Sequence, residues 1–330
     1  MREREIQPSQ IMKTSVISNL TAVAAPLLGL QRKIRDLYIM TLAGGLLMTT
    51  PAQAQNLYFL DAASGSTYQI TPSATLSLFP GSGGVGTGYP IPIAVDSAGD
   101  LFQFPVGAGT VVKLTRAGVK TTFAMGLGFV SDAQFDVFGN LFVTDRSAIT
   151  KITPTGVKST FATLGNLNLA SDRSGNIYII ANGTDLVKFT PGGVRSTIAT
   201  GFAPTNGFYG LATDSKGNIF VADSNNSSII EVTPTGTKAT FATGLASGIF
   251  DGLAIDNSDN LFVGNAFSGA ITKFSPSGVQ TPFLNRGFQQ ESLTFGPPPV
   301  IPEPSTILFG IALSLAGLLG RFGKRGSASR

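Results

Sequence analysis

A motif of about ten residues recurs along the middle of the chain and limits the folds that the chain can adopt. The copies read Asp-x-x-Gly-Asn, or a close variant, followed by apolar residues; they begin at Asp96, Asp136, Asp172, Asp214 and Asp256. Successive copies are spaced by 40, 36, 42 and 42 residues, which is the repeat length of propeller blades. The spacing therefore predicts an all-β array of small, similar sheets.

One repeat unit predicts four short strands, as at residues 211–213, 219–221, 229–232 and 238–241. The Asp-x-x-Gly-Asn link between the first two strands suits a tight turn, because the aspartate side chain can form a hydrogen bond with the nearby backbone and glycine accepts a positive φ. A Thr-Pro-x-Gly or Ser-Pro-x-Gly turn precedes the fourth strand, which often carries Thr-Phe-Ala. The second strands are apolar at consecutive positions, so both of their faces should be buried between neighbouring sheets.

Small residues mark one position of the predicted first strands, at Ala94, Ala170, Ala212 and Ala254. Such residues are expected where blades crowd around a central axis. Gln134 and Thr294 depart from this pattern.

The two ends of the repeat region predict how the array closes. Residues 56–61 resemble a second strand with no first strand before them, and residues 291–296 resemble a first strand with no second strand after them. Pairing the two segments completes a sixth blade and leaves no exposed sheet edge between the first and last blades. We therefore predict a six-bladed β-propeller with four-stranded blades over residues 55–298, in which the first blade is closed by the strand near 291–295.

The segments Gly-Leu-Ala-x-Asp, Gly-Asn-Ile-Phe-Val-Ala-Asp and Thr-Pro-x-Gly resemble those of NHL-repeat and gluconolactonase-like six-bladed propellers. In gluconolactonases, Glu, Asn and Asp side chains at the channel mouth hold a divalent metal, and one of them acts as a base. The corresponding positions here lie five residues before each turn aspartate, at Glu291, Ile91, Ser131, Leu167, Tyr209 and Asp251. The resemblance implies Glu291 and Asp251 as candidate catalytic and metal-binding residues, with Ca²⁺ as a suitable ion. The alternative is a solvated rim that binds no cofactor.

The five recurring aspartates also raise the question of calcium. Their spacing fits no EF-hand loop, because neither the glycine at position six nor the glutamate at position twelve is present. Their recurrence favours hydrogen bonding within the turns.

Several residue types are absent from the whole chain. It contains no histidine, cysteine or tryptophan. The lack of histidine excludes a Ser-His-Asp triad, a histidine-bearing zinc site and a lyase that depends on histidine. No glycine-rich phosphate loop opens a helix, so nucleotide cofactors are not expected.

The N-terminal segment 1–54 is predicted to be a signal peptide with either Met1 or Met12 as its start. A basic cluster at residues 32–35 precedes an apolar stretch at 37–48, and Ala52-Gln53-Ala54 provides small residues for signal peptidase. The mature protein would begin at Gln55.

The C-terminal segment 299–330 combines three features in order: Pro302-Glu303-Pro304, an apolar run at 305–320, and a basic tail at 321–330 with Arg321, Lys324 and Arg325. As a helix, the run would be about 24 Å long, which suits a short transmembrane span. This order resembles the PEP-CTERM sorting signal, which implies cleavage by an exosortase. The alternative is a plain C-terminal anchor.

The two flanking segments carry the positive charge of the chain. The whole sequence has a net charge of +4, but residues 55–299 contain 13 Lys+Arg and 15 Asp+Glu, a net of −2. A nucleic-acid partner is therefore not expected.

Two functional hypotheses follow. In the preferred one, the chain is a non-enzymatic, monomeric surface propeller that is held transiently in the inner membrane. It would then act at the cell surface, the outer membrane or the extracellular matrix, where it binds an exopolysaccharide or a surface protein. In the alternative, it is a metal-dependent lactonase or esterase that uses Asp251 and Glu291.

Overall fold

The computed structural model describes most of the predicted propeller region. The described residues are 55–86, 92–145, 147–164, 168–202, 210–223, 225–245, 252–285, 287–288 and 290–296, with the backbone alone for 290 and 291. All of them belong to one compact unit that spans residues 52–330. The predicted signal segment 1–54 and sorting segment 299–330 lie outside the described residues.

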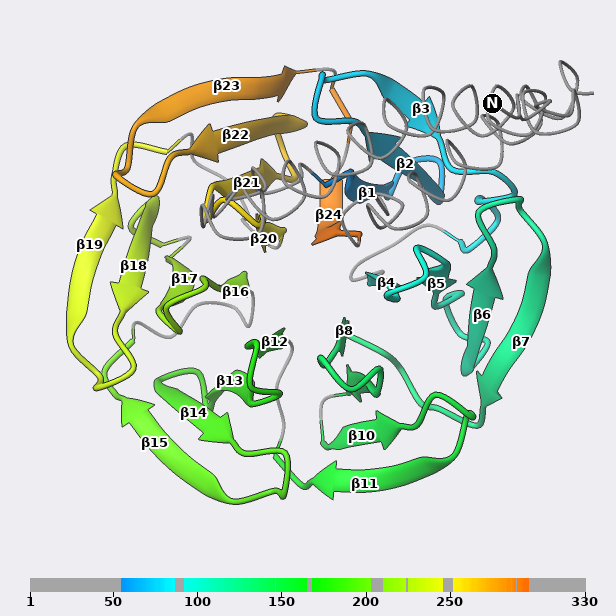
Figure 1. Cartoon of the computed structure of the whole chain (residues 1–330), viewed down its shortest axis with the longest axis horizontal. Helices are drawn as coiled ribbons and strands as arrows, with labels where there is room; N and C mark the ends of the chain where they lie inside the picture. Colours follow the sequence, from blue (N-terminus) through cyan, green and yellow to red (C-terminus); the bar gives the residue numbers. More distant parts are fainter. Residues whose placement is uncertain are drawn as a thin grey trace, which may run out of the picture. The chain divides into compact units, whose positions relative to one another are not determined.

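The described residues form 24 strands in six four-stranded antiparallel sheets, which we number as blades (Figure 1). Blade 1 consists of β24 (Gln290–Phe295), β1 (Leu57–Asp61), β2 (Ser66–Ile70) and β3 (Leu76–Leu78). Blade 2 consists of β4 (Ile93–Val95), β5 (Leu101–Gln103), β6 (Thr110–Leu114) and β7 (Lys120–Met125). Blade 3 consists of β8 (Asp132–Phe135), β9 (Leu141–Thr144), β10 (Ile149–Ile152) and β11 (Lys158–Ala162).

The other three blades repeat this order. Blade 4 consists of β12 (Ala170–Ser171), β13 (Ile177–Ala181), β14 (Asp185–Phe189) and β15 (Arg195–Ala199). Blade 5 consists of β16 (Leu211–Thr213), β17 (Ile219–Asp223), β18 (Ser228–Val232) and β19 (Lys238–Ala242). Blade 6 consists of β20 (Leu253–Ile255), β21 (Leu261–Asn265), β22 (Ala270–Phe274) and β23 (Gln280–Asn285).

Blade 1 is built from both ends of the propeller sequence, as predicted. Strand β24 pairs antiparallel with β1, so that Phe59 lies opposite Leu293 and Leu57 opposite Phe295. The six innermost strands contact one another in sequence around the axis, and β24 lies between β4 and β20 (Figure 1). The predicted six-bladed ring and its closing strand are therefore confirmed.

The two recurrent turns of a blade pack against each other. The turn that links the first and second strands, here called the hub turn, has its glycine at positive φ, as at Gly217 with φ 83°. A Cβ atom at Gly217 would lie 3.5 Å from Pro234 of the Thr-Pro-Thr-Gly turn in the same blade. The repeated glycine thus provides a left-handed backbone and a close fit to the proline.

The blades are joined by buried apolar clusters that repeat around the ring. The small residues of the first strands lie in these clusters; Ala212, for example, packs with Leu253 and Leu261 of the next blade. The phenylalanine of each Thr-Phe-Ala segment contacts the aromatic ring of the second strand edge-on, as in Phe220–Phe241 and Phe142–Phe161, both at 4.9 Å between centroids. Such pairs typically add about 0.5–1.5 kcal/mol beyond the burial of area. The second strands are buried on both faces, as predicted, because each blade lies between two others.

Candidate functional site

A cavity of about 380 Å³ lies at the axis of the ring. All six innermost strands line it at equivalent positions, together with the hub turns that follow them. In four of the six blades, the cavity is lined by a small side chain: Ala94, Ala170, Ala212 or Ala254. In the other two blades, Gln134 and Thr294 line it at the equivalent position. The departures from the small-residue pattern therefore contribute polar groups to this cavity.

The hub-turn aspartates border this cavity, but hydrogen bonds within each turn use their carboxylates. In blade 3, Oδ1 of Asp136 accepts hydrogen bonds from the backbone N–H groups of Phe138 (2.9 Å) and Asn140 (2.8 Å). Oδ2 accepts one from the Asn140 side-chain amide (2.8 Å). The same pattern recurs at Asp172, Asp214 and Asp256. Within the described residues, no cluster of three Asp or Glu side chains is placed to hold a metal ion.

These hydrogen bonds favour the charged form of the carboxylate. Burial alone raises the pKa of Asp172, but hydrogen bonds from Asn176, Tyr178 and Ser174 outweigh it and hold the pKa below its ordinary value. The hydroxyl of Tyr178 donates to Oδ2 of Asp172 at 2.9 Å. Burial first, and then the nearby Asp172 charge, raises the pKa of Tyr178. The lowered pKa of Asp172 and the raised pKa of Tyr178 suit a structural hydrogen bond between the two residues better than proton transfer.

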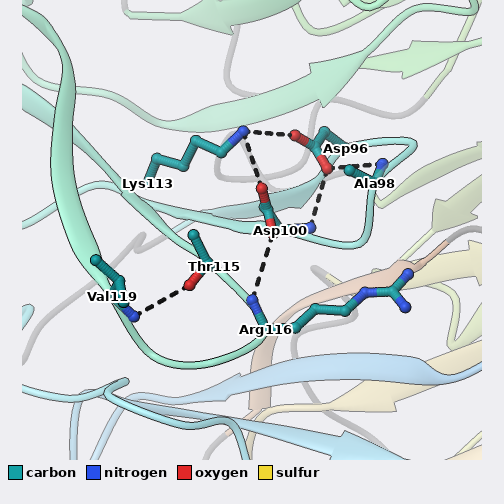
Figure 2. A network of polar contacts seen from close by, with 7 residues as sticks. All are labelled: Asp96, Ala98, Asp100, Lys113, Thr115, Arg116 and Val119. Carbon is teal, nitrogen blue, oxygen red and sulfur yellow. Dashed lines mark hydrogen bonds and ion pairs between the residues drawn. The ribbon is translucent and has the colours of Figure 1, made fainter.

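The hub turn of blade 2 has a different set of side-chain contacts, because Asp100 occupies the position at which the other repeats have asparagine (Figure 2). Lys113 of β6 bridges the two carboxylates, at 3.1 Å from Asp96 and 3.0 Å from Asp100. Burial lowers the pKa of Lys113, but the hydrogen bonds to Asp100 and Asp96 outweigh it and leave the pKa raised. The lysine therefore takes the place of an amide donor and compensates the second negative charge.

Two side chains connect neighbouring blades at the mouth of the axis cavity. Asp259, at φ 60° in the glycine position of the blade 6 turn, accepts hydrogen bonds from the backbone N–H (2.9 Å) and hydroxyl (2.6 Å) of Ser215 in blade 5. Gln55 accepts a hydrogen bond from the Asn257 N–H (2.9 Å) and donates one to the carbonyl of Gly296. Gln55 and Gly296, the first and last described residues, thus meet at this mouth.

The opposite ends of the innermost strands contain a different set of polar groups. Oδ2 of Asp132 accepts a hydrogen bond from the Leu169 N–H of blade 4 (2.6 Å), and Oδ1 accepts one from the Ala133 N–H (2.7 Å). The residue as a whole is partly exposed, but its carboxyl group is enclosed, and burial raises the pKa of Asp132 to about 7. The preceding residue, Ser131, is buried and pairs with Thr144.

Asp132 was not among the residues predicted from the sequence. The only signal for it was an acidic residue four positions before a hub-turn aspartate, where the other first strands have Pro92, Asn168, Gly210, Gly252 and Ser292. Ser292 plays a related role, because its hydroxyl accepts a weak hydrogen bond from the Ile93 N–H of the next blade (3.3 Å).

The two residues predicted to bind metal are not brought together by described side chains. Asp251 lies outside the described residues. Glu291 lies in β24 at an irregularity of the pairing with β1, between Gln290 and Ser292, and only its backbone is described. The metal site therefore stays a prediction.

The predicted processing residues also lie outside the described part of the chain. They are Ala52 and Ala54 at the N-terminal side, and Pro302, Glu303, Pro304, Arg321, Lys324 and Arg325 at the C-terminal side. The described residues contain no helix that is both long and apolar enough to cross a membrane, and the predicted span at 305–320 is not among them.

Comparison with known proteins identifies the fold. No protein-family model matches the chain, and neither does any curated protein. Among solved structures, a chain of a nidogen/laminin complex is similar at 15% identity and a TM-score of 0.61, over 73% of this chain and 98% of that one. A gluconolactonase from Xanthomonas campestris is similar at 14% identity and a TM-score of 0.53, over 73% and 88% of the two chains.

A third similar structure is a catalytically inactive form of virginiamycin B lyase from Staphylococcus aureus, with quinupristin. Its identity is 11% and its TM-score 0.54, over 71% of this chain and 85% of that one. The chain therefore shares the β-propeller fold with these structures, in agreement with the propeller that its repeat motifs predicted.

Proposed function

We propose that this chain is an exported β-propeller that acts as a binding module at the cell surface or in the extracellular matrix. The observation that carries the proposal is the meeting of Gln55 and Gly296 at one mouth of the ring. The Gly296 N–H donates to the carbonyl of Asn56 at 3.1 Å, so the segments on either side are attached at one point. An anchor attached there leaves the circumference of the ring free for a partner.

The charged groups at the hub support a binding role over catalysis. The hub-turn carboxylates accept hydrogen bonds within their own turns, and the chain has no histidine. The inactive virginiamycin B lyase carries an alanine in place of a histidine, so the chemistry of that lyase has no counterpart here. A repeat scaffold without a catalytic set instead presents similar surfaces around a ring.

Processing by signal peptidase and an exosortase completes the proposal. Cleavage after Ala54 would release Gln55 as the new N-terminus, and cleavage near Pro302–Pro304 would release the propeller from the apolar run. The eight residues 297–304 can reach at most about 28 Å, so the hub-turn side would lie near the membrane before release.

The test is to express the full-length chain in an exosortase-containing host and measure the intact mass of the released protein. We expect a product that begins at Gln55 and ends near residue 304. Replacing Pro302 and Pro304 by alanine should retain the chain in the membrane, whereas the matched variant Pro297→Ala/Pro299→Ala should be released normally. Retention of every form at full C-terminal length would support the plain-anchor alternative, and an uncleaved N-terminus in the cytoplasm would contradict export.

The lactonase alternative requires Asp251 and Glu291 to share one ion. Its test is hydrolysis of aldonolactones by the full-length chain with and without Ca²⁺, beside Asp251→Ala and, as a control, Asp223→Ala. Calcium-dependent turnover that is lost only in Asp251→Ala would favour the enzyme over the binding module.

A further inference from the structure

The exposed starts of the outer strands share one composition in blades 2 to 5. Each begins with a basic residue: Lys120, Lys158, Arg195 and Lys238. Hydroxyl side chains dominate the next two positions, as in Lys-Ser-Thr at 158–160, and all three positions are exposed. We call residues 120–122, 158–160, 195–197 and 238–240 the outer belt. None of the six described outer strands contains an acidic residue.

The belt segments recur along the circumference. The outer strands β7, β11, β15 and β19 follow one another around the ring (Figure 1). Two lysines lie at the seams between them. Lys158 donates to the carbonyls of Met125 and, at 3.0 Å, Gly126 of the preceding blade. Lys238 donates to the equivalent carbonyls of Thr200 (2.7 Å) and Gly201 (3.2 Å). These two bonds hold each side-chain nitrogen in place and use two of the three N–H groups of a lysine, so one is left for a ligand.

A crevice opens beside each of these two lysines. One has a volume of about 290 Å³ and is lined by Lys158, Ser159, Thr160 and Asp145, among others. The other, of about 250 Å³, is lined by the repeat-equivalent residues Lys238, Ala239, Thr240 and Asp223. The crevices alternate with the belt positions of Lys120 and Arg195, so concave sites and exposed charges recur along one line.

Protection of sheet edges is the competing explanation for these charges. Outer strands have unpaired backbone groups, and charged residues on such strands discourage edge-to-edge association. Lysine is especially common in that role, so edge protection accounts for the sign of the charges. It does not account for their distribution, because the equivalent residues of the outer strands in blades 6 and 1 are the uncharged Gln280 and Leu76. A ligand of opposite charge explains the restriction of the basic residues to one arc of four consecutive blades.

We propose that the outer belt binds a linear acidic polysaccharide, and this proposal rests on the binding role proposed above. Carboxylates of the polymer would pair with the basic residues, and its hydroxyl groups would exchange hydrogen bonds with the serine and threonine side chains between them. Each ring of a polyuronate carries both a carboxylate and hydroxyl groups, which matches the pairing of a basic residue with neighbouring serine and threonine side chains in the belt.

The experiment measures the binding of the full-length chain to alginate, a polyuronate, by affinity electrophoresis, with uncharged dextran for comparison. Alginate should retard the chain, and this effect should weaken between 50 and 500 mM NaCl, whereas dextran should have no effect. Each exposed charge contact contributes about a two- to fivefold change in affinity. The double variant Lys120→Gln/Arg195→Gln should therefore bind alginate roughly fivefold or more weakly. It keeps the seam hydrogen bonds of Lys158 and Lys238 and removes a weaker one, from Lys120 to the Gly83 carbonyl (3.4 Å).

The matched control is Arg173→Gln/Lys216→Gln, which removes the same charge from exposed positions in the hub turns. It should bind alginate as the unchanged chain does. The variant Lys158→Gln/Lys238→Gln tests the two crevices, with circular dichroism to establish that the fold is retained.

Two results would overturn the proposal: equal losses in the belt and hub variants, or alginate binding that is absent or insensitive to salt. Tighter binding of duplex DNA than of alginate would also overturn the choice of ligand. Because export and processing are measured separately by intact mass, failure of the belt proposal would leave the proposed export untouched.

Discussion

The two ends of the innermost strands place aspartate in opposite surroundings. At the hub-turn end, the carboxylate of Asp172 accepts several hydrogen bonds and its pKa is lowered. At the other end, Asp132 has two backbone donors in an enclosed position, and burial raises its pKa to about 7. Burial favours the neutral acid at both ends, and the hydrogen-bond donors decide whether the charged form is favoured in spite of it.

The largest expected effect is a pH dependence that originates at Asp132. Its pKa is higher in the folded than in the unfolded protein, so the folded state binds the extra proton between about pH 4 and pH 7. The contribution of Asp132 to stability is present at pH 4 and is lost as the pH rises through 7, at a cost on the order of 4 kcal/mol. The free energy of unfolding, measured with urea, should decrease less from pH 5 to pH 8 in Asp132→Asn than in the unchanged chain.

The matched variant is Asp172→Asn, where the sign reverses. The folded-state pKa of Asp172 is lowered, so its stabilisation is present above the unfolded pKa and is lost as the pH falls below about 4. An identical pH dependence in the two variants would show that the ends of the strands do not differ as described.

A smaller effect is expected when a hub-turn carboxylate is removed. Asp136→Ala leaves the Phe138 and Asn140 N–H groups and the Asn140 amide without their acceptor, at a cost of about 3 kcal/mol in the free energy of unfolding. The control is Asp145→Ala, which also removes three hydrogen bonds but at an exposed loop, and should cost about 1 kcal/mol. Urea unfolding measures both, and a cost for Asp136→Ala no larger than that of the control would contradict a structural role for the hub aspartates.

The smallest effect is expected in blade 2. Asp100→Asn restores the residue found in the other hub turns and removes one of the two ion pairs of Lys113. Because both carboxylates of this network are partly exposed, the free energy of unfolding should change by less than about 1 kcal/mol. Its dependence on NaCl concentration should weaken. An undiminished salt dependence would mean that the Lys113 network makes no electrostatic contribution.

Local features of the sequence were sufficient to predict the hub turns and the ring. The partners of a hub aspartate lie two and four residues away, so the repeat itself contains the interaction. The closing blade was predictable because a second-strand pattern without a first strand at residues 56–61 has its counterpart at 291–296.

The polar contacts that join different blades were not predicted. The partner of Asp132 is the N–H of Leu169, which is 37 residues away on the next blade, and no local pattern reports it. The sequence does show a basic residue after the Pro-x-Gly turn in several repeats. Its contact with the preceding blade could not be predicted, because that contact depends on how the outer strands follow one another around the ring. The metal site inferred from resemblance depends on side chains of Asp251 and Glu291, and it stays a prediction.

The closure of the ring can be measured directly, because the chain contains no cysteine to interfere with cross-linking. Leu60 of β1 and Ser292 of β24 are paired residues, so Leu60→Cys/Ser292→Cys places two thiols at disulfide distance. Mild oxidation followed by non-reducing electrophoresis should convert most of this variant into a cross-linked monomer, whereas Leu60→Cys/Ala212→Cys, with its second thiol on blade 5, should stay reduced. Cross-linking of the paired cysteines no faster than that of the control would show that the ring is not closed by its two ends.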